Sequence, residues 1–136
     1  MKKKFEAMVL SCMDPRFQSC VHKFLKDKKL INQYSAFTIA GAAAGVTHSK
    51  FKQWHSTFLD NLRASIQLHQ INKLIVINHE DCGAIKIAEG KKSYDELTVH
   101  KKSFKKLKTI LAEKFPKLKL EFYLVGLDKK FMKLNF

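Results

Sequence analysis

Short apolar segments alternate along this chain with segments whose apolar residues recur every three or four positions, and this alternation restricts the fold more than any other feature. The strand-like runs are residues 5–11, 34–40, 73–78 and 119–125, and the segments with helical spacing are residues 17–29, 50–69 and 104–115. Apolar runs rich in β-branched residues favour buried strands, and the three-to-four spacing favours amphipathic helices. Strands that are separated by helices pair in parallel, so the pattern predicts an α/β fold.

We expect a mainly parallel sheet, with the strands in the order 2-1-3-4 and helices on both faces. Residues 130–134 follow a turn at 126–128 and are expected to add a short antiparallel edge strand. A chain of 136 residues with 46% hydrophobic content is the size of one domain, so we assign residues 1–136 to a single domain. In this order the connections after strands one and two lie on opposite faces. The carboxyl ends of strands one and three then form a switch point, the usual ligand site of such sheets.

Two short polar motifs follow those two strands directly. Residues 12–16 (CMDPR) come after the first strand, and residues 79–83 (HEDCG) come after the third. Both motifs are therefore expected at the same edge of the sheet. Together they supply two thiols, an imidazole and a carboxylate, and sulfur and nitrogen ligands of this kind suit Zn²⁺.

The Cys-x-Asp-x-Arg and His-x-x-Cys-Gly motifs resemble the zinc signature of the β-class carbonic anhydrases, and the resemblance covers most of the chain. It implies that Cys12, His79 and Cys82 ligate Zn²⁺. Asp14 would take the fourth position in a closed form or, paired with Arg16, would leave that position to water. In the open form the resemblance implies reversible hydration of carbon dioxide to bicarbonate through zinc-bound hydroxide. Asp14 and Arg16 would be the catalytic pair, since Asp14 can orient the hydroxide and Arg16 can hold the carboxylate.

The family usually carries an Arg-Asn-Ala-Gly stretch after its second strand, whereas residues 37–45 contain neither Arg nor Asn. This departure leaves the substrate open, and two alternatives stand beside carbon dioxide hydration. The chain could act on another small linear molecule such as CS₂ or COS. It could instead be a non-catalytic zinc-stabilised module, with Asp14 on the metal and an acidic partner on its basic surface. Thiol chemistry at Cys12 is disfavoured, because Arg16 follows too closely for a phosphate-binding loop.

The formal net charge of +14 comes almost entirely from lysine, because Arg16 and Arg63 are the only arginines. Arginine is the side chain suited to bidentate recognition of bases and phosphates, so we expect no specific nucleic-acid partner. The expected partners are carbon dioxide or bicarbonate and further copies of the chain, as a homodimer or a larger homo-oligomer.

Cysteine usage and hydropathy bear on where the protein works. Three cysteines, an odd number, fit metal binding better than a disulfide framework and indicate the cytoplasm. Cys20 falls on the first expected helix, where we assign it to core packing. No apolar run approaches the ~20 residues that span a bilayer, so we expect no membrane association.

Overall fold

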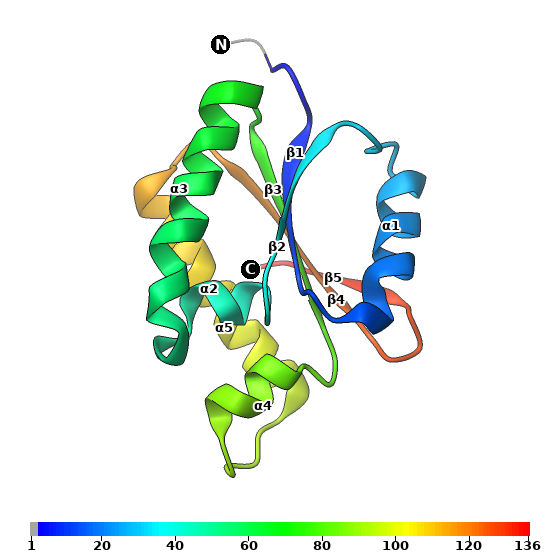
Figure 1. Ribbon diagram of the computed structural model, residues 1–136, viewed down its shortest axis with the longest axis vertical. Helices are drawn as coiled ribbons and strands as arrows, with labels where there is room; N and C mark the ends of the chain where they lie inside the picture. Colours follow the sequence, from blue (N-terminus) through cyan, green and yellow to red (C-terminus); the bar gives the residue numbers. More distant parts are fainter. Residues whose placement is uncertain (1–2) are drawn as a thin grey trace.

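The computed structural model describes residues 3–136, which contain five strands and five α-helices (Figure 1). In chain order the elements are β1 (Ala7–Ser11), α1 (Gln18–Asp27), β2 (Tyr34–Thr38), α2 (Ala43–Thr47), α3 (Lys52–His69), β3 (Lys73–His79), α4 (Gly83–Glu89), α5 (Glu96–Lys114), β4 (Lys119–Val125) and β5 (Phe131–Leu134). Single 3₁₀ turns at Pro15–Phe17 and Ser49–Phe51 lead into α1 and α3. Among the described helices, none has both the length and the apolar character needed to cross a bilayer.

The five strands form one sheet in the order β2-β1-β3-β4-β5. β1 pairs in parallel with both β2 and β3, so that Leu10 lies beside Phe37 on one side and Val76 on the other. β4 continues the parallel sheet, and β5 runs antiparallel to β4 at the edge. The predicted α/β class, strand order and antiparallel edge strand are therefore confirmed.

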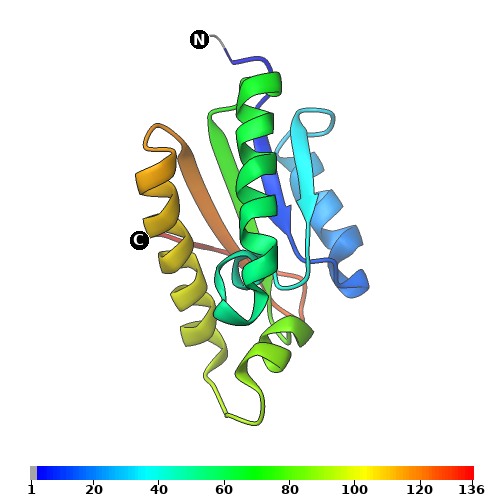
Figure 2. The ribbon, with the colours of Figure 1, turned by 60° about the vertical axis from the view of Figure 1, so that its left-hand side comes forward.

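The two faces of the sheet are covered by different helices, because successive side chains of a strand point to opposite faces. Leu10 and Val76 belong to a core with residues of α3 and α5, whereas Val9 and Ile77 belong to a second core with residues of α1. Figures 1 and 2 show α1 on one side of the sheet and α2, α3 and α5 on the other. The crossovers therefore lie on opposite faces around β1, as the switch-point argument requires.

The segment after β2 does not lead directly into the long helix that the spacing of residues 50–69 predicts. α2 is a separate short helix there, and all five of its residues are buried. Gly45 lies so close to the carbonyl of Ala40 that a Cβ atom could not be accommodated. A helix that is buried on every side shows no amphipathic stripe, which is why the sequence pattern does not reveal it.

Candidate metal centre

The side chains of Cys12, His79 and Cys82 converge at the carboxyl ends of β1 and β3. Cys12 directly follows β1, His79 is the last residue of β3, and Cys82 immediately precedes α4. One ligand atom from each residue lies within 4.8 Å of the others, and all three residues are buried. The pairing of β1 with β3 brings the two motifs together as predicted. Within residues 3–136, no other cysteine or histidine joins this cluster.

The ring of His79 is held in the form that a metal ligand requires. Its Nδ1 lies 2.6 Å from the carbonyl oxygen of Glu80, which can only accept, so Nδ1 carries the proton. Phe17 stacks on the ring at a centroid distance of 4.2 Å. The lone pair is therefore on Nε2, which is buried and has no hydrogen-bond partner among the described residues. A buried polar atom without a partner is costly, and a metal ion would satisfy it.

The two thiols share one negative charge between them. Hydrogen bonds from the Cys82 thiol and the Gly41 amide stabilise the Cys12 thiolate, and they lower the pKa of Cys12 to about 4 against the opposing effect of burial. The Gly41 N–H donates to the Cys12 sulfur over 3.3 Å. Contact with that thiolate, together with burial, raises the pKa of Cys82. An anionic pair of sulfurs beside a neutral imidazole is a donor set that attracts a soft divalent cation.

Asp14 lies next to this cluster and is held by Arg16. The guanidinium donates to both carboxylate oxygens, with the shortest bond, from Nη2 to Oδ2, at 2.8 Å, and the Arg16 backbone N–H adds another to Oδ1 at 2.8 Å. These bonds to Arg16 lower the pKa of Asp14 to about 2. Asp14 Oδ2 lies 3.7 Å from His79 Nε2, so the carboxylate is adjacent to the three possible ligands.

Asp81 is a site residue that the sequence did not single out, although it stands inside the second motif. Its carboxylate accepts from Arg16 Nη1 at 3.1 Å, and its carbonyl accepts from Nη2 at 2.9 Å. It also pairs with Lys86 of α4, and Lys86 and Arg16 together lower the pKa of Asp81. Arg16 therefore connects the two motifs, one at the end of β1 and the other at the end of β3.

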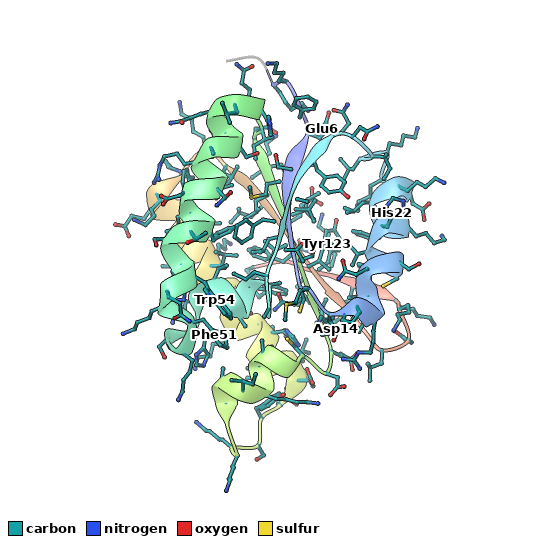
Figure 3. All side chains as sticks on the ribbon, viewed as in Figure 1. Glu6, Asp14, His22, Phe51, Trp54 and Tyr123 are labelled. Carbon is teal, nitrogen blue, oxygen red and sulfur yellow. The ribbon has the colours of Figure 1, made fainter. Side chains whose placement is uncertain are left out.

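A mostly apolar cleft of about 530 Å³ opens beside Cys12 and Asp14. Phe51, directly before α3, and Trp54, in its first turn, line the cleft together with Ile87 of α4, which is 72% exposed. Figure 3 shows Asp14, Phe51 and Trp54 at the same end of the molecule. Phe51 is part of the core on this face of the sheet and Trp54 packs against that core, and both also form the wall of this cleft.

The residues present fit a structural or catalytic zinc ion. Zinc is bound in proteins mostly by thiolate and imidazole groups, and catalytic sites commonly use three protein ligands. The cluster supplies two thiols and one imidazole, and its unpartnered Nε2 atom is otherwise unexplained. Cys20 takes no part: as predicted, it lies on α1, where its thiol donates to the Phe17 carbonyl over 3.3 Å.

Known proteins resemble this chain along most of its length. A family model described as "Putative carbonic anhydrase" matches residues 1–126. An uncharacterized protein of Rickettsia bellii is 32% identical over 125 residues, covering 89% of this chain and 76% of that protein. A second uncharacterized protein, from Rickettsia conorii, is 30% identical over 125 residues, covering 89% of this chain and 67% of that protein.

Solved structures of low sequence identity share the fold. A carbonic anhydrase from Glaciozyma antarctica superimposes with a TM-score of 0.62 at 18% identity, covering 98% of this chain and 83% of its own. A structure from Sordaria macrospora, one of two tetrameric β-carbonic anhydrases, gives a TM-score of 0.61 at 8% identity. The match covers 99% of this chain and 83% of the Sordaria chain.

Proposed function

This chain belongs to the putative carbonic anhydrase family as a divergent β-class-like member, and we propose that it is a zinc lyase that reversibly hydrates carbon dioxide to bicarbonate. The observation that carries the proposal is the buried Nε2 of His79, which lacks a partner within the described chain and belongs to a cluster with two thiols. Cys12, His79 and Cys82 would hold the ion. When bound, zinc would act as a Lewis acid that makes water nucleophilic near neutral pH.

Asp14 and Arg16 supply the protein's own part of the chemistry. With a pKa of about 2, Asp14 is a carboxylate at neutral pH and can accept a hydrogen bond from a nucleophilic water at the site. Arg16 fixes the direction of that carboxylate by bonding to both of its oxygens. Because these bonds hold Asp14 to Arg16, they favour the open site over the closed form in which Asp14 is the fourth ligand.

The cleft supports a small, uncharged substrate. Its walls are mainly apolar side chains, among them Phe51 and Trp54, which suit carbon dioxide better than a charged molecule. COS and CS₂ have the same linear shape, and residues 37–45 lack the Arg and Asn that usually line the site in the family. The experiment below therefore includes these two molecules as alternative substrates.

We also propose that the protein works as a homo-oligomer, a dimer or larger, in the cytoplasm. Support for assembly comes from the fold relatives from Sordaria macrospora, which are tetrameric. Support for a reducing compartment comes from the three cysteines, all of them free thiols. Sedimentation velocity on the zinc-loaded protein tests the assembly, and a single monomeric species would contradict it.

Metal content combined with stopped-flow carbon dioxide hydration from acid to alkaline pH tests the function. We expect about one zinc per chain and a clear rate enhancement. Cys82→Ser should lose zinc and activity, whereas Cys20→Ser, which changes a thiol outside the cluster, should keep both. Asp14→Asn should keep zinc and lower the rate by about 100-fold, the scale of a lost proton-transfer partner.

The outcomes separate the candidate functions. Protein that is purified without chelators and contains no zinc would contradict every metal-dependent reading. Stoichiometric zinc with hydrolysis of COS or CS₂ but no hydration of carbon dioxide would transfer the proposal to those substrates. Bound zinc without activity on carbon dioxide, COS or CS₂ would favour the remaining candidate, a non-catalytic zinc-stabilised module that binds an acidic partner.

A further inference from the structure

Behind the metal cluster lies a buried chain of hydrogen bonds that begins at Asn78, the residue before His79. Asn78 is 1% exposed, and its Oδ1 accepts from the backbone N–H of Ala43 in α2 over 3.0 Å. This bond fixes the orientation of the amide, so its Nδ2 group must face the other way. There it donates to His100 Nδ1 at 3.0 Å and to Ser103 Oγ at 3.1 Å, both on α5.

The amide of Asn78 determines the tautomer of His100. Because Nδ1 accepts a hydrogen bond from Asn78, the proton of the neutral ring is on Nε2. His100 is fully buried, and burial lowers its pKa, which keeps the ring neutral. The Nε2–H then donates to Oε2 of Glu96, one helical turn earlier, over 3.1 Å.

Glu96 also bonds to the loop between His79 and Cys82. Its second oxygen, Oε1, accepts from the backbone N–H of Asp81 over 3.1 Å. Asp81 has a left-handed backbone conformation, with φ of 58°, which a non-glycine residue rarely adopts without support. The carbonyl and carboxylate of Asp81 in turn accept from Arg16, which holds Asp14.

We propose that Glu96 and His100 are positioning residues that fix the peptide of Asp81 and, through it, the Arg16–Asp14 pair and the loop carrying His79 and Cys82. The inference deepens the proposed function, on which its catalytic meaning rests. Every bond in the series has an assigned donor and acceptor, from the Ala43 amide to the Asp81 amide. Outer partners of this kind commonly change metal affinity or activity by about 10-fold to 100-fold when they are removed.

A carboxylate is required at position 96, which gives the proposal a sharp test. Glu96 accepts one N–H on each of its two oxygens. In Glu96→Gln one of these positions becomes an NH₂ group, which would face another donor. The variant therefore keeps the size and shape of the side chain and loses one bond of the series. Its side chain is 38% exposed, so the substitution should not prevent folding.

The experiment combines NMR of the ¹⁵N-labelled protein as purified with release of zinc to a chelator. In Glu96→Gln we expect the Asp81 amide to exchange at least about 10-fold faster, while the Leu10 amide in the central strand is unchanged. The ¹⁵N shifts of the His100 ring should change from a single Nε2–H tautomer to a mixture. Zinc should leave about 10-fold to 100-fold faster. Glu113→Gln, the same change at an exposed position of α5, is the matched control and should behave as wild type.

Exchange at Asp81 and zinc release within two-fold of wild type in Glu96→Gln would overturn the proposal. Equal effects in Glu113→Gln would also overturn it, because they would trace to the lost charge rather than to the hydrogen bonds. If Glu96→Gln had the expected effects but the wild type did not hydrate carbon dioxide, the positioning role would be supported. Only the proposed reaction would then be contradicted. If the protein held no zinc but Glu96→Gln still made the Asp81 amide exchange faster, the positioning of the Asp81 peptide would be supported and the proposed zinc-dependent reaction would be contradicted.

Discussion

Arg16 controls the protonation of Asp14, and this control can be measured directly. We expect Arg16→Ala to raise the pKa of Asp14 from about 2 toward its ordinary value of 3.8, because the variant lacks the guanidinium bonds that stabilise the carboxylate. Titration of the ¹³C-labelled carboxyl group by NMR checks this value. Arg63→Ala, which removes the other arginine, should leave Asp14 unchanged. A pKa that stays near 2 in Arg16→Ala would contradict the pairing.

The same shift predicts how the pair responds to acid. The folded protein binds the Asp14 proton less readily than the unfolded chain does, so the pairing stabilises the fold above pH 3.8. That contribution is lost as the pH falls from 3.8 through about 2. The difference in urea stability between wild type and Arg16→Ala should therefore shrink over this interval.

At the scale of single residues, the sequence alone predicted the site residues that belong to a recognisable motif. Cys12, His79 and Cys82 meet as expected, because Cys12 and His79 stand at the ends of recognisable strands and Cys82 follows His79 by three residues. Asp81 was missed because its importance depends on where Arg16 reaches, which no spacing reveals. The separation of four between Glu96 and His100 does place them on one helical face. Their link to Asn78 needs the packing of α5 on β3.

At the scale of secondary-structure elements, the burial of every residue of α2 makes this helix sensitive to substitution. We expect Gly45→Ala to destabilise the fold by about 1–3 kcal/mol, because the added methyl would press against the Ala40 carbonyl and force the backbone to shift. Gly83→Ala is the matched control, since a Cβ there meets no atom within 4 Å at the start of α4. Urea unfolding checks both variants. Equal stability for the two variants would show that α2 moves without cost.

The strands were easier to predict than the short helices. β3 and β4 are apolar runs with strong strand propensity, and their observed bounds fall within one residue of those expected. α5 begins at Glu96, earlier than its apolar stripe from Phe104 suggested. Its start is set by Asp95, whose carboxylate accepts from the backbone N–H of Thr98 over 2.9 Å. A capping bond of this kind is a local signal that the apolar pattern does not contain.

For the whole molecule, the net charge of +14 predicts stability that depends on salt. Raising KCl from about 20 to 200 mM should increase the melting temperature, because shorter screening lengths weaken repulsion among the lysines. Two pairs of exposed lysines on α5 lie one helical turn apart, and the members of each pair repel each other: Lys101 with Lys105, and Lys102 with Lys106. Replacing these four with Gln should stabilise the protein at low salt and reduce its salt dependence, as followed by circular dichroism. A melting temperature independent of KCl would contradict this account.

The convergence of β1 and β3 also sets the order of events when the chain folds. Cys12 and Cys82 come from distant parts of the sequence, and the chain between them forms α1, β2, α2, α3 and β3. Pairing of such distant segments is slow, because the chain loses the entropy of a long open loop before stabilising contacts form. During synthesis, β3 and Cys82 must leave the ribosome before the three candidate ligands can meet. An ion captured at that moment would close the loop and hold the late contact in place, so metal supply would influence how much of the newly made chain stays folded.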